Sequence, residues 1–338
     1  MHRNSGTVGP LAAAVVVAAL LPTAALAQDT AAPRTAWGAP DLQGVWDYRS
    51  LTPMERPADL ADTAVFSEEE AVEFAAETLR RRSRDNDTTS PLVPYNDFWF
   101  EEGTSVNTAR TSLIVDPPDG RIPPLTDAAQ KRLIARRQAR ASVTRHEPTP
   151  GGWVEDLGSG MFAVRCILGF NSGPPMTPAG YNQNLQLFQT EDHVVLYTEM
   201  VHSARIVPLD GRDHVDPDIR QWMGDSRGYW DGDTLVVETV NFLRETSFRN
   251  GLSDANLRLT ERFTRASDST LLYEVTVDDP TAWIKPWTYQ IPMQKSDLPL
   301  YEYACHEGNY GLYNILVVAR EREAAEEAAR AAAQQSSR

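Results

Sequence analysis

Leu257–Asp278, which reads LRLTERFTRASDSTLLYEVTVD, is the stretch of sequence that decides the fold class. In its first run the alternating sets are Leu257, Leu259, Glu261 and Phe263 against Arg258, Thr260, Arg262 and Thr264. After the turn 266–269, a second run alternates in the same way, with Leu271, Tyr273, Val275 and Val277 as one set. Neighbouring side chains of a strand point to opposite faces of the sheet. Paired runs of this kind therefore predict antiparallel strands with one buried face.

Similar short runs continue on both sides of this hairpin. We expect strands at 42–49, 111–115, 161–168, 183–190, 193–200, 203–208, 226–230, 233–241, 257–265, 270–278, 286–293 and 300–304. Trp230-Asp231-Gly232-Asp233 contains the Asp-Gly pair that is typical of a tight hairpin turn. Strands and helices do not alternate regularly, which disfavours a parallel sheet. A sheet of so many strands must protect its two edges, so we expect a mainly β, antiparallel, barrel-like domain, with a β-sandwich as the alternative.

Three helical segments accompany the expected strands. Ser67-Glu68-Glu69-Glu70 has the pattern of a capping box and predicts a helix at 67–82, with Val72, Ala76 and Leu79 as its apolar stripe. A second helix is expected at 126–141, and a charged helical tail at 321–338. We see no internal repeat and no clear linker, so residues 41–320 are expected to form one β-rich domain that carries the first two helices as insertions.

The N-terminal segment has the features of an export signal. A charged start precedes an apolar run over about 11–26, which ends in the small-x-small cleavage site Ala25-Leu26-Ala27. We therefore expect a signal peptide at 1–27, a flexible leader at 28–40 and a periplasmic or secreted mature chain. The apolar run is too short and too interrupted for a retained membrane span, and no second run is long enough to cross a bilayer.

Both cysteines, Cys166 and Cys305, lie in the expected mature chain. Thiols that meet an oxidising compartment usually pair, so we expect a disulfide, with two separate buried thiols as the alternative. The formal net charge of −15 disfavours nucleic acid and anionic membrane surfaces as partners, because like charges repel.

Two resemblances add expectations. Gly44-Val45-Trp46 resembles the Gly-x-Trp signature that opens lipocalin-like barrels, which implies a lipocalin- or calycin-like barrel with a ligand mouth. Longer strings are similar to those of an uncharacterised family of exported bacterial β-rich proteins, and they lie at 40–46, 110–116, 220–228 and 303–311. This second resemblance covers most of the mature chain. It implies export, and it brings no activity and no catalytic residue with it.

The first candidate site is a group of polar residues inside an apolar run. Glu199, His202 and Arg205 stand between Val194-Val195-Leu196 and Ile206-Val207. A carboxylate could orient the imidazole, and the guanidinium could hold an anionic group. In a straight strand His202 faces away from Glu199 and Arg205, so the three side chains converge only if a bulge or turn lies near Val201. An ordinary strand with a solvent-facing polar side is the alternative.

The second candidate site follows Cys305. His306 and Glu307 are suitable general acid–base groups, and Asn309 and Tyr310 could donate hydrogen bonds to a developing oxyanion. The alternative is a turn that is fastened by the disulfide and has no chemical role.

Three further groups of residues could bind a ligand. Trp222, Asp225 and Arg227 lie around a Gly-containing loop and suit a ligand rim, with an Asp–Arg pair that braces the loop as the alternative. Tyr181-Asn182-Gln183-Asn184 forms another polar patch, for which a simple turn is the alternative. Several tryptophans could line a pocket, although most should be core residues: Trp99, Trp222, Trp283 and Trp287.

The motifs of familiar enzymes are missing from the sequence, including the nucleophile elbow, the Walker loop, the dinucleotide fingerprint and His-Glu-x-x-His. His202, His214, His306 and Glu307 are acceptable zinc or iron ligands, but no pair has a diagnostic spacing, so we expect no metal and no cofactor.

The sequence therefore favours a cofactor-independent acid–base enzyme, a lyase, isomerase or hydrolase, that acts on a small, partly apolar molecule. His202 or His306 would be the acid or base, and Glu199 or Glu307 would orient it. A lipocalin-like binding protein without catalysis is the first alternative. The second is a cell-envelope interaction protein that uses the basic helix at 126–141 and the charged tail.

Overall fold

The structure is a computed structural model that describes residues 33–336, apart from 86–95, 104–105, 107–109, 142–162, 164, 244–247, 249–252 and 254. The expected signal peptide at 1–27 and the leader up to residue 32 lie outside the described residues. Both stay predictions.

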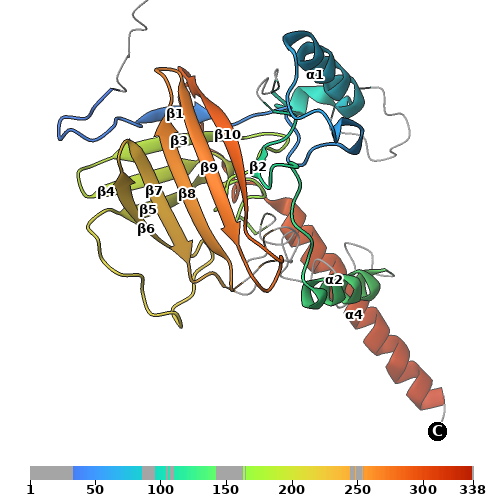
Figure 1. Ribbon diagram of the computed structural model, residues 1–338. Helices are drawn as coiled ribbons and strands as arrows, with labels where there is room; N and C mark the ends of the chain where they lie inside the picture. The colour runs from blue at the N-terminus through green and yellow to red at the C-terminus, as the bar shows by residue number, and fades with distance from the viewer. Residues whose placement is uncertain are drawn as a thin grey trace, which may run out of the picture. The chain divides into compact units, whose positions relative to one another are not determined.

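One antiparallel sheet dominates the described part of the chain (Figure 1). Its strands are β1 (Gly44–Asp47), β2 (Ile114–Asp116), β3 (Asn184–Gln189), β4 (His193–Thr198), β5 (Ser203–Pro208), β6 (Asp225–Asp231), β7 (Thr234–Val240), β8 (Arg258–Arg265), β9 (Thr270–Asp278) and β10 (Trp287–Ser296). They are hydrogen-bonded in the order β5-β4-β3-β1-β10-β9-β8-β7-β6, and the short β2 also pairs with β10. The mainly β, antiparallel prediction is confirmed.

The period-2 pattern of the sequence sets which face of the sheet is buried. On β8 the side chains of Leu259, Glu261 and Phe263 are buried, and on β9 those of Leu271, Tyr273, Val275 and Val277 are. The expected turn after β6 is also present, where Gly232 has a φ of 59° that suits a residue without a Cβ atom. The buried sets of all the long strands meet in one hydrophobic core, which therefore lies on one face of the sheet.

The two edge strands of the sheet, β5 and β6, approach each other. A Cβ atom added to Gly228 on β6 would lie 2.9 Å from Val207 Cγ1 and 2.7 Å from Leu209 Cδ2. Among the described strands no hydrogen-bonded ladder joins β5 to β6, so the sheet is not closed. The expected closed barrel is therefore not confirmed, and the lipocalin-like fold stays an expectation.

The three longer helices are α1 (Glu68–Arg82), α2 (Asp127–Arg140) and α4 (Tyr310–Ser336). The capping box at Ser67 is confirmed, because Ser67 Oγ accepts from Glu70 N at 3.2 Å and Ser67 N donates to Glu70 Oε2 at 2.7 Å. The expected apolar stripe of α1 is wrong by one position, since the buried residues are Ala71, Ala75 and Thr78. Small side chains allow closer packing of a helix than the larger Val72 and Leu79, which are exposed.

Two expected strands are absent from the described residues. Residues 165–168 form turns and bends, and 300–304 have no strand pairing. Both segments run into the disulfide between Cys166 and Cys305, whose Cα atoms are 5.9 Å apart. The expected disulfide is thus confirmed. The covalent bond holds these two short apolar segments as loops where the sequence pattern alone indicated strands.

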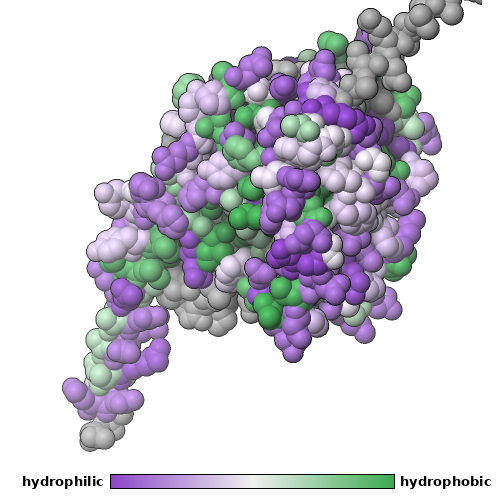
Figure 2. Space-filling model, turned by 90° about the vertical axis from the view of Figure 1, so that its left-hand side faces the viewer, coloured by the Kyte–Doolittle hydropathy of each residue, from purple (hydrophilic) through white to green (hydrophobic). Residues whose placement is uncertain are grey.

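The face of the molecule in Figure 2 is largely polar. Figure 2 shows hydrophilic residues over most of the face that it presents, with apolar residues in separate groups among them. No helix in the described ranges has the length and apolarity that crossing a bilayer requires.

Candidate functional site

The chain turns sharply at the first predicted site. Met200–His202 form a short 3-10 helix between β4 and β5, and Val201 and His202 have φ values of 60° and 42°. This turn lies at the position that the convergence of Glu199, His202 and Arg205 requires. The three side chains nevertheless separate. Glu199 and Arg205 are buried, whereas His202 is exposed.

Glu199 lies beside β3 and Tyr48. Its Oε2 accepts from Asn184 Nδ2 at 2.7 Å, and its backbone N–H donates to Asn184 O at 2.9 Å. Burial, reinforced by the negative charges of Glu199 and Asp47, raises the pKa of the Tyr48 phenol far above its usual value. The Glu199 carboxylate therefore binds the side chain of Asn184 and adds negative charge near the buried Tyr48.

Arg205 points into the core of the sheet and not toward His202. Its guanidinium donates to both carboxylate oxygens of Glu261 on β8, with 2.8 Å between Nη2 and Oε1. Its Nη1 also lies 3.3 Å from Thr239 Oγ1 on β7. A buried charge is strongly unfavourable unless it is paired, and this pair satisfies both partners at once. Arg205 therefore links three strands from inside.

The buried polar network extends beyond this ion pair. The Tyr273 hydroxyl donates to Glu261 Oε1 at 2.7 Å and accepts from the backbone N–H of Met176 at 3.1 Å. The Tyr289 hydroxyl donates to Met176 O at 2.7 Å. Burial, and then the charge of Glu261, raise the pKa of Tyr273 well above its usual value, so this phenol stays protonated. The two tyrosine hydroxyls hold the backbone of Met176 against the buried face of β9 and β10.

The sequence contains one signal for this network, at Glu261, which is not among the predicted site residues. Glu261 occupies the buried phase of the alternating run on β8, between Leu259 and Phe263. A carboxylate in that phase requires a buried partner. Which residue supplies the positive charge depended on how the sheet brings β5 and β8 together.

The two predicted sites do meet at their histidines. The ring centroids of His202 and His306 are 6.2 Å apart, although 104 positions separate the two residues in the chain. Cys305, next to His306, is tied to Cys166, and Asn309 Nδ2 lies 3.9 Å from Cys166 Sγ. The other residues predicted here, Glu307 and Tyr310, are exposed. The disulfide turn thus presents His306 and its neighbours to solvent beside His202.

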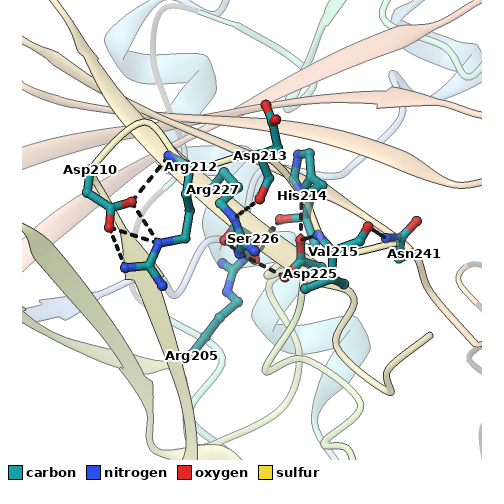
Figure 3. A network of polar contacts seen from close by, with 11 residues as sticks. Arg205, Asp210, Arg212, Asp213, His214, Val215, Asp225, Ser226, Arg227 and Asn241 are labelled. Atoms are coloured by element: carbon teal, nitrogen blue, oxygen red, sulfur yellow. Dashed lines mark hydrogen bonds and ion pairs between the residues drawn. The ribbon is translucent and has the colours of Figure 1, made fainter. Parts of the chain in front are cut away.

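The third predicted group braces a loop (Figure 3). Asp225 at the start of β6 is buried, and its carboxylate contacts His214 Nδ1 at 2.8 Å, the Val215 N–H at 3.1 Å and Arg227 Nη1 at 2.8 Å. Arg227 Nε also donates to Asp213 O at 3.0 Å. These bonds hold residues 213–215 against the sheet. Trp222 lies farther along the same loop and is partly exposed.

A cavity of about 480 Å³ lies elsewhere, and most of the residues that line it are outside the predicted sites. We call it the aromatic–arginine groove, and its lining consists of Ser50, Thr52, Pro53, Met54, Arg82, Arg84, Phe100, Glu102, Leu113, Phe170, Pro178, Ala179, Gly180 and Tyr181. Tyr181 belongs to a polar patch that the sequence did indicate. The remaining residues come from segments far apart in the chain, so no local pattern could have grouped them.

The groove combines aromatic rings with paired charges. Tyr181 packs edge-on against Phe170 and Phe100, with ring centroids 5.3 Å and 6.1 Å away. The Arg84 guanidinium lies 3.4 Å above the Phe100 ring, which is a cation–π contact. Glu102 accepts from Arg82 at 2.6 Å and from Arg84 at 3.4 Å, so one carboxylate faces two cations.

A smaller cavity of about 220 Å³ adjoins the groove through the shared residues Arg82, Phe100 and Glu102. Asp97 lines this second cavity. Hydrogen bonds from the Ser83 hydroxyl and from the Arg84 backbone N–H lower the pKa of the Asp97 carboxyl. Asp97 therefore holds the backbone at Arg84 in place while remaining ionised.

The expectation that most of the four tryptophans are core residues holds for two of them. Trp283 and Trp287 are buried in the core, whereas Trp99 and Trp222 are partly exposed. Within the described ranges, no group of three or more His, Cys, Asp or Glu residues could hold a metal ion.

These features define an antiparallel β-sheet protein with peripheral helices, one disulfide, a buried ion-pair network and an aromatic–arginine groove. No family model, curated protein or solved structure matches the chain.

Proposed function

We propose that this protein is exported and binds a small, partly apolar molecule with an acidic group in the aromatic–arginine groove. The observation that carries the proposal is the groove itself, a cavity of about 480 Å³ with aromatic walls and two arginines. Ligand sites in proteins usually enclose about 300–1,000 Å³ and combine an apolar lining with a few polar groups that fix orientation.

The aromatic rings support the apolar part of the ligand. Phe170 is exposed to about half of its area, although it packs on Tyr181 at the groove. Exposed rings that converge on a cavity leave apolar surface that a flat ligand could cover.

The charges support the acidic part of the ligand. Arg82 and Arg84 share the single carboxylate of Glu102, which leaves the large cavity with one more positive than negative side chain. Guanidinium groups recognise carboxylates with two parallel hydrogen bonds. This local excess stands out in a chain with a formal net charge of −15.

The disulfide supports the proposal that the protein is exported to an oxidising compartment. Cys166 and Cys305 are bonded, and such bonds persist mainly in oxidising environments such as the periplasm or the exterior. A lipocalin-like closure of the sheet, with β5 against β6, would accord with a carrier, and the close packing of Gly228 against Val207 favours it.

An acid–base enzyme is the second candidate, and the proximity of His202 and His306 favours it. The His202 Nδ1 atom lies 2.8 Å from Tyr303 O, so its Nε2 atom is the nitrogen with a lone pair to act as a base. The catalytic set would then be His202 and His306, with Glu307 beside them. Purified protein in which His202→Ala and His306→Ala leave every detectable turnover unchanged would rule this candidate out.

The binding proposal is tested by ligand capture and titration. Native mass spectrometry of the full chain purified from its own host should show a retained small molecule, and benzoate or indole-3-carboxylate should raise the thermal midpoint of the protein. Tyr181→Ala should abolish that rise, because it removes the ring that joins both walls of the groove. Tyr229→Ala is the matched control, since Tyr229 is an exposed tyrosine on β6 that does not line the groove.

If no member of a broad panel of aromatic acids shifts the midpoint, and no retained molecule is found, the binding proposal is wrong. An equal loss in Tyr181→Ala and Tyr229→Ala would also contradict it, because the effect would then not come from the groove.

A further inference from the structure

The two imidazoles of His202 and His306 lie close together, and both residues are exposed. Their ring centroids are 6.2 Å apart and their planes are inclined by 56°. Because a zinc–imidazole bond is about 2.0–2.1 Å long and a ring nitrogen lies about 1.2 Å from its centroid, an ion bonded to both rings lies about 3.2 Å from each centroid. At the tetrahedral angle that zinc prefers, the two centroids lie about 5.2 Å apart. The observed separation is 6.2 Å, and both rings are exposed, so rotation of the side chains by about 1 Å toward each other brings them to one ion.

His202 already has the hydrogen bond that metal-binding histidines usually have. Its Nδ1 lies 2.8 Å from the carbonyl oxygen of Tyr303, and a carbonyl only accepts, so Nδ1 carries the proton. Nε2 therefore keeps its lone pair for an ion. Metal-ligating histidines typically donate their second N–H to a carbonyl or carboxylate in this way, which fixes the ring orientation and increases its basicity.

The backbone holds both rings in place. Val201 and His202 have φ values of 60° and 42°, a left-handed conformation that is unfavourable for side chains with a Cβ atom, above all for the β-branched Val201. Strained positions of this kind often occur at functional sites. On the other side, the bond from Cys305 to Cys166 fixes the turn that carries His306. His202 therefore lies on a strained turn, and His306 lies on a turn that a disulfide holds, at one place on the surface.

We propose that His202 and His306 together bind a single divalent transition-metal ion, of the zinc or copper type, at this turn. Imidazole nitrogen is a preferred ligand of both ions. Two ring nitrogens leave at least two coordination positions for water or an external ligand, because the described residues supply no group of three possible ligands. The site is separate from the aromatic–arginine groove, and the proposal does not rest on ligand binding there.

The test is titration of the full chain, purified without a polyhistidine tag, with Zn²⁺ and separately with Cu²⁺. Isothermal titration calorimetry should show one equivalent bound, and His202→Ala and His306→Ala should each weaken binding by at least about tenfold. His193→Ala is the matched control, since His193 is a partly exposed histidine on β4 that contacts Asp192, and it should keep the wild-type affinity.

A second measurement locates the ion. Substoichiometric Cu²⁺ should broaden the ring proton signals of His202 and His306 before those of His193 and His214. Circular dichroism of each metal-free variant shows whether the fold is retained. If a variant loses its fold, the broadening pattern of the wild type decides the question alone.

The proposal is overturned if neither ion binds with one-to-one stoichiometry, or if His202→Ala and His306→Ala bind as tightly as the wild type. Early broadening at His214 with His202 unaffected would also refute it. Metal binding with no aromatic acid bound at the groove would leave this inference standing while the proposed function fails.

Discussion

Arg205 on β5 and Glu261 on β8 form a two-point ion pair inside the core, with side chains that are 10% and 0% exposed. β5 and β8 are not neighbours in the sheet, so the pair connects strands that no backbone ladder joins. Its geometry requires the sheet to bend until the inner face of β5 approaches that of β8. The Arg205–Glu261 pair can form only because the sheet is curved in this way. A single substitution of either residue should therefore disturb the curvature.

Replacement of Arg205 should destabilise the protein strongly. Arg205→Met leaves the Glu261 carboxylate buried without its cation, and loss of one partner of a buried ion pair typically costs about 3–5 kcal/mol. Urea denaturation followed by tryptophan fluorescence measures the free energy of unfolding. Adding Glu261→Leu to Arg205→Met should restore part of the loss, because the double variant no longer contains an unpaired buried charge.

Arg262→Met is the control for this prediction. Arg262 pairs with Asp231 at 2.8 Å on the exposed side of the sheet, where ion pairs contribute about 0–1 kcal/mol. Similar losses in Arg205→Met and Arg262→Met would show that the buried pair has no special role.

The buried tyrosines should make the protein sensitive to alkali. The pKa of Tyr273 lies well above its usual value because the phenol is buried, and the neighbouring Glu261 adds to the effect. Above about pH 10 the unfolded chain releases this proton and the folded chain does not, so stability present at lower pH falls as the pH rises. Each such tyrosine contributes a slope of about 1.4 kcal/mol per pH unit.

The measurement is the free energy of unfolding between about pH 8 and pH 11. Tyr273→Phe should reduce the alkaline slope, although it also lowers stability at neutral pH by removing the bonds to Glu261 and Met176. Tyr313→Phe, at an exposed position on α4, should keep the wild-type slope. An unchanged slope in Tyr273→Phe would contradict the prediction.

Removal of the disulfide should destabilise the protein, although the strands of the sheet should still form. Cys166 and Cys305 are 139 positions apart, and loss of a native bond that closes a long loop typically costs about 2–5 kcal/mol. Thermal unfolding of the Cys166→Ala/Cys305→Ala variant measures the effect. Reduction of the wild type should lower the midpoint by a similar amount, and a much smaller change on reduction would show that the substitutions act through packing.

Opposite substitutions in the aromatic–arginine groove should change the affinity for an aromatic carboxylate in opposite directions. Arg84→Gln removes a cation and should weaken binding by about tenfold, as expected for loss of one charge-assisted hydrogen bond. Glu102→Gln removes the anion that competes for Arg82 and Arg84, so binding should tighten. Titration of each variant with benzoate, with Arg262→Gln as the remote control, decides the signs. A loss of affinity in both variants would mean that the ligand is not held through its negative charge.

Local sequence patterns predicted the structure correctly where contacts between residues close in the chain determine it. The alternation around Phe263 and Tyr273 predicted both strands and their buried faces, and the Asp-Gly turn at Gly232 predicted the hairpin. The capping box at Ser67 set the start of α1 for the same reason, since Ser67 and Glu70, three positions apart, satisfy each other's backbone N–H groups. These features depend on backbone geometry and on contacts within a few positions.

The candidate sites depended on contacts between distant parts of the chain. Glu199, His202 and Arg205 lie within seven positions, yet the turn at Val201 and the curvature of the sheet send them to three different surroundings. The ring of His306, more than a hundred positions away, lies 6.2 Å from that of His202, whereas the Arg205 guanidinium binds Glu261 in the core.

The sequence by itself determined most of the antiparallel strands, the starts of α1 and α2, and the two cysteines available for a bond, because periodicity, caps and residue types act over short distances. It placed the start of the C-terminal helix at residue 321, whereas α4 begins at Tyr310. Only the tertiary structure decided that Arg205 pairs with Glu261, that His202 lies beside His306, and that Arg84, Phe100 and Tyr181 line one groove. The physical reason is that side-chain burial and charge pairing depend on which strands and loops the folded sheet brings together, and no local pattern encodes that meeting.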